Sequence, residues 1–333
     1  MRILLLAFGM APSVTNGSSR YASSLYSSLR SSLGQKNVRI FWGGSRGLPR
    51  KLRSAGWATV GLPHPEGLCK GFEPNIVQSL ESGTVPSTKT AHLVVTVHDV
   101  CALLRPDLVP WRIVALKRLS WLRRHNWDAI IVPSEATRQN LLHLGLPPEK
   151  INVVSPGVEV VPPRREDAAE AEEISGGRPY VLVIGNPSLK KGSDLLLKAW
   201  GAAGITDGNI IWIAKDGRML AGKPGILRVG EVSDPLLSSL YEGSAAVVVS
   251  SRWEGYSFPV AEAMIRGIPV IASAIPAHRE FGDGPHFYEV EDISQLQLLL
   301  GRAFDGALQG KLRGFPQWRD TALEVDAIYR KLL

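Results

Sequence analysis

Residues 250–273 of the chain read SSRWEGYSFPVAEAMIRGIPVIAS. The apolar residues 246–249 before them predict a buried strand, residues 259–266 predict a helix with Pro259 in its first turn, and residues 270–272 predict the next strand. A strand, a glycine-containing loop, a helix and a second strand in this order are typical of an α/β sheet. The backbone N–H groups of the loop and of the helix start would form a cradle for an anion.

Two glutamates lie in this unit. Glu254 is in the loop, and Glu262 is one to two turns into the expected helix. A carboxylate accepts two hydrogen bonds from vicinal hydroxyls, which is what a ribose offers. The spacing alone fits equally well two solvated glutamates on an ordinary strand–loop–helix unit.

The same alternation of strands and helices extends over the chain. Two halves with this pattern predict an α/β protein with two doubly wound, parallel-sheet domains, and two such domains facing each other would enclose a cleft at the carboxyl ends of their strands. The segment that carries Pro162-Pro163, an acidic run and Gly176-Gly177 predicts a linker or a linker with a short exposed helix. The expected domains are residues 1–160, a linker at 161–178, residues 179–316, and a last helix at 317–333 that crosses back to the first domain. The other expected strands are residues 2–8, 38–42, 93–97, 129–132, 180–184 and 210–214, and the other expected helices are 20–33, 111–124 and 194–200.

Composition narrows the function classes. The formal charge of +7 and the pI near 9.5 favour an anionic partner, which nucleotide phosphates, nucleic acid and anionic lipid all satisfy. Cys69 and Cys101 are too few for a disulfide framework or a zinc site. The amino-terminal apolar run of about six residues indicates a first strand rather than a secretory signal, and no run reaches the roughly 18 residues of a membrane span. A Rossmann oxidoreductase is disfavoured because no G-x-G-x-x-G follows the first strand, and no nucleic-acid-binding fold is recognisable.

A basic turn and a histidine follow two of the expected strands. Lys190 and Lys191 lie directly after strand 180–184, where two ammonium groups suit a diphosphate; a solvated basic turn is the alternative. His98 and Asp99 stand at the carboxyl end of strand 93–97, where a lone histidine is more often a packed structural residue and Asp99 could equally be a helix cap.

Two further segments, residues 16–21 and 111–124, give weaker indications of function. In the segment 16–21, Gly17 permits close approach of the backbone to a phosphate, and Arg20 could reach the same place. Residues 111–124 combine two tryptophans with five basic residues, which fits either a surface helix packed on its own domain or a helix at a membrane interface.

The frame E-G-x-x-x-P-x-x-E-A-x-x-x-G-x-P-V-I-A-S, from Glu254 onward, resembles the signature of the retaining GT-B glycosyltransferases of family 4. The resemblance extends over most of the chain and implies the GT-B fold, in which two Rossmann-like domains face across a cleft. In that family the second glutamate, here Glu262, binds the ribose of the donor nucleotide. The first, here Glu254, lies near the donor sugar, and the backbone of the residues after it contacts sugar and diphosphate: Tyr256, Ser257 and Phe258.

The other motifs acquire roles through the same resemblance. Lys190 and Lys191 match the phosphate-binding motif, at positions where many members have Arg-Lys, and Asn186 stands where other members have an arginine directly after the strand glycine. Contact with a diphosphate would therefore be through point charges rather than an arginine fork. Gly230 lies in a loop, residues 229–232, similar to the one that contacts the nucleobase. His98 resembles the strand-end histidine beside the donor sugar and the acceptor hydroxyl. Gly17 corresponds to the family's glycine-containing first loop, on the donor side, which is usually Gly-Gly and here has Asn16 in the first position. Arg20 and Asp99 are assigned to the acceptor side.

The function implied by the resemblance is transfer of a hexose from a nucleoside-diphosphate sugar, GDP-mannose or a similar donor, to a hydroxyl acceptor with retention. No cofactor or metal is expected, since no Asp-x-Asp pair occurs and the lysines neutralise the leaving group. The expected setting is bacterial polysaccharide or glycolipid assembly in the cytoplasm, with a lipid-linked glycan as an acceptor class, peripheral contact with the membrane, and no nucleic acid partner. The alternatives are a nucleotide-sugar epimerase or a phosphorylase on a similar frame, and a catalytically silent sugar-nucleotide-binding subunit.

Overall fold

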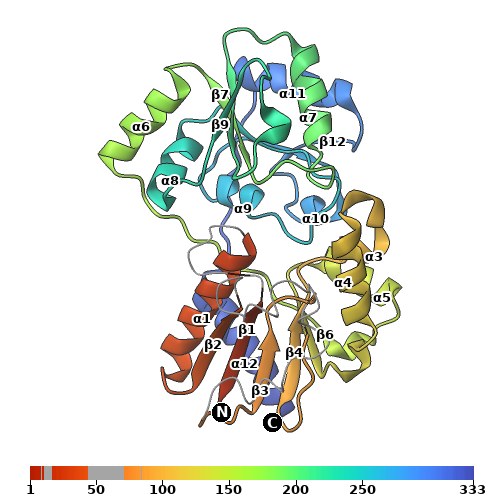
Figure 1. Ribbon diagram of the computed structural model, residues 1–333. Helices are drawn as coiled ribbons and strands as arrows, with labels where there is room; N and C mark the ends of the chain where they lie inside the picture. The colour runs from red at the N-terminus through yellow and green to blue at the C-terminus, as the bar shows by residue number, and fades with distance from the viewer. Residues whose placement is uncertain (9, 11–16, 44–70, 84) are drawn as a thin grey trace. The chain divides into compact units, whose positions relative to one another are not determined.

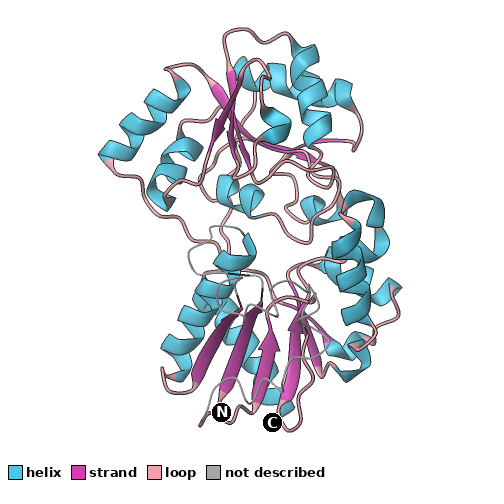
Figure 2. Ribbon diagram, viewed as in Figure 1, coloured by secondary structure: helices cyan, strands magenta, loops and turns pink. Residues whose placement is uncertain are grey.

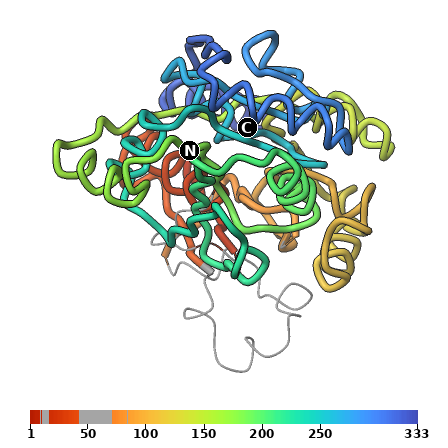
Figure 3. Tube along the Cα trace, turned by 90° about the horizontal axis from the view of Figure 1, so that it is seen from above, coloured from red at the N-terminus to blue at the C-terminus, as the bar shows by residue number. Residues whose placement is uncertain are grey.

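The computed structural model describes residues 1–8, 10, 17–43, 71–83 and 85–333, and Figure 3 follows the chain from its red amino terminus to its blue carboxyl terminus. The chain forms two compact units. Unit 1 comprises Met1–Gly157 and Pro316–Leu333, and unit 2 comprises Val158–Phe315.

Unit 1 is built on one parallel sheet of six strands in the order β2-β1-β3-β4-β5-β6 (Figure 2). The order reverses between β1 and β3: the chain passes from β1 to β2 on one side of this point and from β3 to β4, β5 and β6 on the other. The strands are β1 (Ile3–Phe8), β2 (Val38–Gly43), β3 (Ile76–Ser79), β4 (His92–Thr96), β5 (Ala129–Val132) and β6 (Ile151–Val153).

Strands β3 and β6 were not among the predicted strands, and the four residues of β3 include the polar Gln78 and Ser79. Both are fully buried, and Gln78 forms hydrogen bonds inside the fold: its Nε2 donates to Thr96 Oγ1 at 2.8 Å, and its Oε1 accepts from Tyr329 Oη. Burial of these polar groups is tolerated because each finds a partner.

The described helices of unit 1 flank this sheet (Figure 1). The final helix, α12, packs against α1, so the end of the chain returns to unit 1. Gly157 allows this approach, because a Cβ atom there would lie 2.4 Å from the backbone nitrogen of Trp318. The helices are α1 (Gly17–Leu33), α3 (Cys101–Leu104), α4 (Trp111–Trp121), α5 (Glu135–His143) and α12 (Trp318–Leu332).

Unit 2 repeats the plan with a second parallel sheet, in the order β12-β11-β10-β7-β8-β9. Here the order reverses between β7 and β10. The strands are β7 (Tyr180–Ile184), β8 (Asn209–Ile213), β9 (Ile226–Val229), β10 (Ala246–Val249), β11 (Val270–Ser273) and β12 (His286–Tyr288), and the helices are α6 (Arg165–Ser175), α7 (Ser193–Ala203), α8 (Asp234–Glu242), α9 (Phe258–Met264), α10 (Pro276–Arg279) and α11 (Ile293–Phe304).

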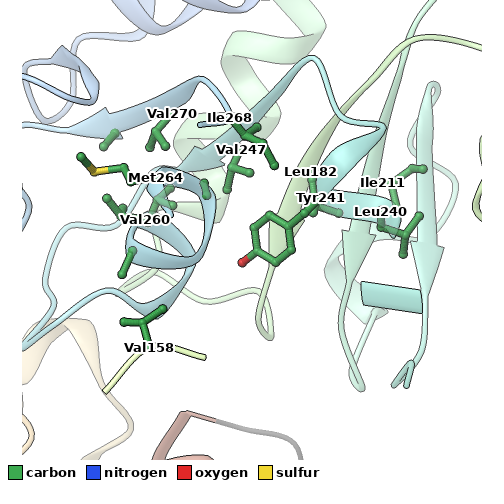
Figure 4. Packing of buried hydrophobic residues seen from close by; sticks show 14 of the residues in the cluster. Val158, Leu182, Ile211, Leu240, Tyr241, Val247, Val260, Met264, Ile268 and Val270 are labelled. Carbon is green, nitrogen blue, oxygen red and sulfur yellow. The ribbon is translucent and has the colours of Figure 1, made fainter. Parts of the chain in front are cut away.

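Alternate side chains of each strand in unit 2 enter different apolar clusters. Leu182 and Val247 belong to the cluster shown in Figure 4, together with Leu240 and Met264 from the helices. The neighbouring residues on the same strands belong to a second cluster that α7 and α11 cover. Since successive strand residues point to opposite faces, both faces of the sheet are buried. The two parallel, helix-flanked sheets confirm the predicted class of two doubly wound α/β domains.

The segment predicted as a linker at 161–178 contains helix α6, and α6 packs against α8 as part of unit 2. Its first turn is closed by Asp167, which accepts hydrogen bonds from the backbone N–H and the guanidinium of Arg164, and Gly176 ends it in the left-handed region at φ 63°. None of the described helices combines the length and the apolar composition needed to cross a bilayer.

Candidate functional site

The loops after β7 and β10 meet at the point where the strand order of unit 2 reverses. The two strands are neighbours, with Val181 paired to Ala246 and Leu182 to Val247. In open α/β sheets, ligands bind at the carboxyl ends of the strands at such a switch point. One loop carries Lys190 and Lys191, the other Glu254.

Lys191 and Glu254 form an ion pair across this switch point, although 63 residues separate them in sequence. Lys191 Nζ donates to Glu254 Oε1 at 2.6 Å, and Ser251 Oγ donates to the same oxygen at 2.6 Å. The lysine side chain is 36% exposed and the glutamate 10%, so the ammonium faces solvent more than the carboxylate does. An ammonium has three donors, and Glu254 therefore fixes its place without exhausting its capacity.

The ionisation of Glu254 follows from its surroundings. Burial acts to raise the pKa of this carboxyl, but the positive charges of Lys191 and Lys190 and the neighbouring His278 act against burial and prevail, so the pKa lies below its ordinary value. Glu254 is consequently an anion at neutral pH. It accepts hydrogen bonds, which suits the hydroxyls of a sugar.

The two loops are joined by backbone contacts. Gly192, at φ 61°, lies so close to the other loop that a Cβ atom would stand 1.9 Å from the carbonyl oxygen of Ser250. Ser250 Oγ donates to the carbonyl of Lys191 at 2.9 Å, and the N–H of Arg252 donates to the carbonyl of Lys190 at 2.8 Å. The position of the lysines is therefore set by the β10 loop as well as by their own.

Arg252 connects the lysine turn to the start of α7 and to Glu291. Its guanidinium donates to both carboxylate oxygens of Asp194 at 2.5 and 2.8 Å, to Glu291, and to the carbonyl of Leu189 at 2.9 Å. These hydrogen bonds raise the pKa of Arg252 and lower those of Asp194 and Glu291. A planar fork with several donors fixes the loop geometry more firmly than a lysine would.

Glu262 lies on α9 and is 5% exposed. The hydroxyl of Tyr241, on α8, donates to its Oε2 at 2.7 Å. Just before α9, Ser257 is buried at the N-cap position, and the rings of Tyr256 and Phe258 pack edge to face at 5.4 Å. These three residues thus precede or begin the helix that carries Glu262.

Gly230 follows β9, which lies two strands from β7 in the sheet. Beside it, Lys215 after β8 and Glu231 form an ion pair at 2.7 Å. Gly230 is therefore at the same edge of the sheet as the lysine turn but further along it.

The residues predicted from the first half lie in unit 1. His98 Nε2 contacts the carbonyl oxygen of Leu80 at 3.0 Å; because that oxygen only accepts, Nε2 carries the proton. The His98 ring packs edge to face on Tyr21 at 4.9 Å. Burial lowers the pKa of His98 in spite of the nearby carboxylate of Glu81, which is paired with Lys117.

Asp99 and Arg20 both lie in unit 1. Asp99 Oδ1 accepts from the N–H of Cys101 at 2.9 Å and so closes the turn that leads into α3. Arg20 is half-buried in the first turns of α1, which begins at Gly17. Cys101 is buried, whereas Asn16 and Cys69 lie outside the described residues.

The sequence did not reveal His278, which lies behind Glu254 on the short helix α10. Its side chain is fully buried, and Nδ1 donates to the carbonyl of Ser273 at 2.8 Å, while among the described residues Nε2 has no hydrogen-bond partner. Ser273 Oγ in turn donates to the carbonyl of Ser251. Burial lowers the pKa of His278 against the attraction of Glu254. The available signal was its position directly after strand β11, next to β10 in the sheet.

Two glycosyltransferase family models match the chain. Residues 33–161 match the model of Glycosyltransferase Family 4, and residues 178–297 match that of Glycosyl transferases group 1, so the two together account for about three quarters of the chain. A curated relative, the MMP α-(1→4)-mannosyltransferase of Mycolicibacterium hassiacum, is 28% identical over 115 residues, which are 31% of this chain and 28% of that protein. The match thus spans little more than a quarter of the relative's length.

Solved structures share the fold at low identity. Sucrose-phosphate synthase from Thermosynechococcus elongatus superposes with a TM-score of 0.73 at 15% identity, over 99% of this chain and 98% of that one. Anabaena HepE, in complex with UDP and glucose, superposes with a TM-score of 0.68 at 15% identity, over 99% and 95%. With its two doubly wound sheets, the glutamate-bearing loop after β10 and the two family matches, the chain belongs to the group 1, family 4 glycosyltransferases of GT-B fold.

Proposed function

We propose that this glycosyltransferase transfers a hexosyl group from a nucleoside-diphosphate sugar to a hydroxyl acceptor with retention of configuration. The observation that carries the proposal is the Lys191–Glu254 pair at the switch point of unit 2, with Lys190 beside it. At this point a cation that suits a diphosphate lies beside a carboxylate that suits sugar hydroxyls, and both follow the carboxyl ends of neighbouring strands.

In this proposal the lysines stabilise the leaving group. When the bond between the sugar C1 and the diphosphate oxygen breaks, the electron pair remains on that oxygen, and a cation held near it lowers the barrier. Lys191 is held by Glu254 and by the backbone contacts of Gly192 and Ser250, so little reorganisation accompanies the reaction. Lysines supply this charge without a divalent metal. His98, in unit 1, is retained as the acceptor-side residue that the family resemblance implies.

The donor proposed is a GDP-mannose-type sugar nucleotide. The mannosyltransferase relative favours a mannosyl group, whereas HepE was solved with UDP and glucose, so UDP-glucose is the competing donor. A thermal-shift panel of UDP-, GDP-, ADP- and dTDP-sugars separates them. We expect the largest rise in melting temperature with a GDP-sugar; a rise with a UDP-sugar alone would overturn the donor assignment.

The reaction class is tested by incubating the selected donor with hydroxyl acceptors and following free nucleoside diphosphate and glycosylated product. We expect diphosphate release to rise with acceptor, and EDTA to leave the rate unchanged. An isomerised donor without diphosphate release would indicate an epimerase. Binding without either product would indicate a catalytically silent subunit, and loss of turnover in EDTA would refute the metal-independent mechanism.

The acceptor proposed is a lipid-linked glycan, reached by peripheral contact with an anionic membrane during polysaccharide or glycolipid assembly at the cytoplasmic leaflet. The supporting feature is the exposed side of α4 and its C-cap, where Trp111 is 73% and Leu122 65% exposed and Arg118 lies between them. Positions 111, 115, 118 and 122 follow one helix face, and basic residues with an exposed tryptophan suit an interface.

Sedimentation with vesicles tests this contact. We expect binding to vesicles of anionic lipid but weak binding to phosphatidylcholine alone, and a loss of several-fold in the Trp111→Ala variant. Leu312→Ala provides a control at an equally exposed apolar side chain of unit 2. Equal binding of the wild type to both vesicle types, or an unchanged Trp111→Ala variant, would refute the membrane proposal.

A further inference from the structure

The hydroxyl of Tyr241 contacts the carboxylate of Glu262 in the interior of unit 2. Tyr241 is fully buried, and its hydroxyl donates to Glu262 Oε2 at 2.7 Å. Glu262 is itself 5% exposed, so hydrogen bonds from protein donors such as Tyr241 take the place of most contacts with water. The two residues come from different helices, α8 and α9, so this hydrogen bond links the carboxylate of Glu262 to a neighbouring helix rather than to its own.

Tyr241 has little freedom to release this bond. Its ring belongs to the apolar cluster of Figure 4, where it lies among side chains from the sheet and from α9. The guanidinium of Arg266 lies 4.5 Å from the ring centre, in cation–π contact. Arg266 also donates to the backbone carbonyl of Glu262 at 2.6 Å and to Ser238 Oγ at 2.8 Å. One arginine thus ties α9 to the helix that carries the tyrosine.

We propose that Tyr241 is a positioning residue for nucleotide recognition: by donating to Oε2 it fixes the direction in which Glu262 accepts hydrogen bonds from the ribose 2′,3′-diol. The inference rests on the proposed function, with Glu262 binding that ribose as the family resemblance implies. Two hydroxyls a fixed distance apart need a carboxylate in one rotamer, and a carboxylate that turns freely loses part of the bidentate contact.

A purely structural role would be that Tyr241 only satisfies a buried charge. The two roles differ in one measurable quantity, the preference of the protein for a ribonucleotide over the same nucleotide without its 2′- and 3′-hydroxyls. General destabilisation affects both ligands alike and cancels in this ratio. Tyr180 is a matched control, because it is also buried in the cluster and its hydroxyl donates to the carbonyl of Leu240 at 2.9 Å, away from Glu262.

The experiment is titration calorimetry of UDP and GDP, each beside its 2′,3′-dideoxy form. For the nucleotide that binds, we expect the wild type to prefer the ribose form by roughly 100-fold, as two hydrogen bonds to a carboxylate would give. Tyr241→Phe should lower this preference by roughly ten-fold, by weakening only the ribose form. Glu262→Ala should abolish it, and Tyr180→Phe should leave it unchanged.

An unchanged preference in Tyr241→Phe, with its loss in Glu262→Ala, would overturn the positioning role and uphold ribose binding. An unchanged preference in Glu262→Ala would instead refute the ribose role within the proposed function. If Tyr241→Phe does not fold, 4-fluorophenylalanine at position 241 answers the same question, because it keeps nearly the volume of the tyrosine ring but has no hydroxyl to donate to Glu262 Oε2. A reduced preference in that variant supports the positioning role, and an unchanged one contradicts it.

Discussion

Replacing Lys191 by alanine separates the chemistry of the Lys191–Glu254 pair from its contribution to stability. Removing a preorganised donor to a transition-state anion costs about 10²–10³ in kcat, or about 3–4 kcal/mol. The same change leaves Glu254, whose side chain is 10% exposed, without its principal cation. Breaking a buried pair costs about 3–5 kcal/mol, but the lysine is 36% exposed and solvent screens it, so we expect a stability loss of about 1–2 kcal/mol.

The assay combines urea unfolding with initial rates at saturating donor. A second variant, Lys191→Ala/Glu254→Gln, removes the unpaired charge, because the amide needs no counter-ion. We expect this double variant to regain most of the stability and none of the turnover. Lys311→Ala is the control, since it removes a lysine from an exposed ion pair with Asp283 in the same unit and should change neither quantity appreciably.

Turnover of Lys191→Ala within about three-fold of the wild type would refute the leaving-group role, since a lost transition-state donor costs far more. Recovery of turnover in the double variant would refute it too, because the loss would then stem from the unpaired glutamate.

Two further predictions concern the framework of the site. Gly192→Ala should lower the free energy of unfolding in urea by roughly 2–4 kcal/mol, because φ is 61° and the new Cβ would meet the carbonyl of Ser250. Gly204→Ala, at the other end of α7, should cost only about 1 kcal/mol, because φ is 65° there but no atom lies within 4 Å of the new Cβ. Equal losses in the two variants would contradict the close approach of Gly192 to Ser250. Burial lowers the pKa of His278, so between that pKa and the ordinary 6.5 the unfolded chain binds more protons and stability falls as the pH falls. His278→Gln should therefore weaken the loss of stability between pH 7.5 and 5.5, and an unaltered slope would show that His278 does not titrate as described.

The architecture could be predicted from the sequence because buried parallel strands are continuous apolar runs, and such a run can be recognised within a single short segment. Strands β3, β6, β9 and β12 were missed. In β3 the buried residues Gln78 and Ser79 are polar, and their burial is acceptable only because of distant partners such as Thr96. For residues 161–178 the sequence predicted a linker or a linker with a short exposed helix, and the structure shows helix α6 there, packed against α8. That contact could not be predicted, because α8 lies about sixty residues further along the chain.

For the site, the family, the two loops and the candidate residues Lys191, Glu254 and Glu262 could be predicted from the amino-acid sequence, because the motif is local and its spacing can be read from one segment. The contacts of these residues depend on the fold. The pairing of Lys191 with Glu254 and that of Tyr241 with Glu262 arise where strands or helices remote in sequence become neighbours, and His278 enters the site through the order β11-β10-β7. The charge and direction of a buried carboxylate depend on its surroundings, and those are assembled only when the chain folds.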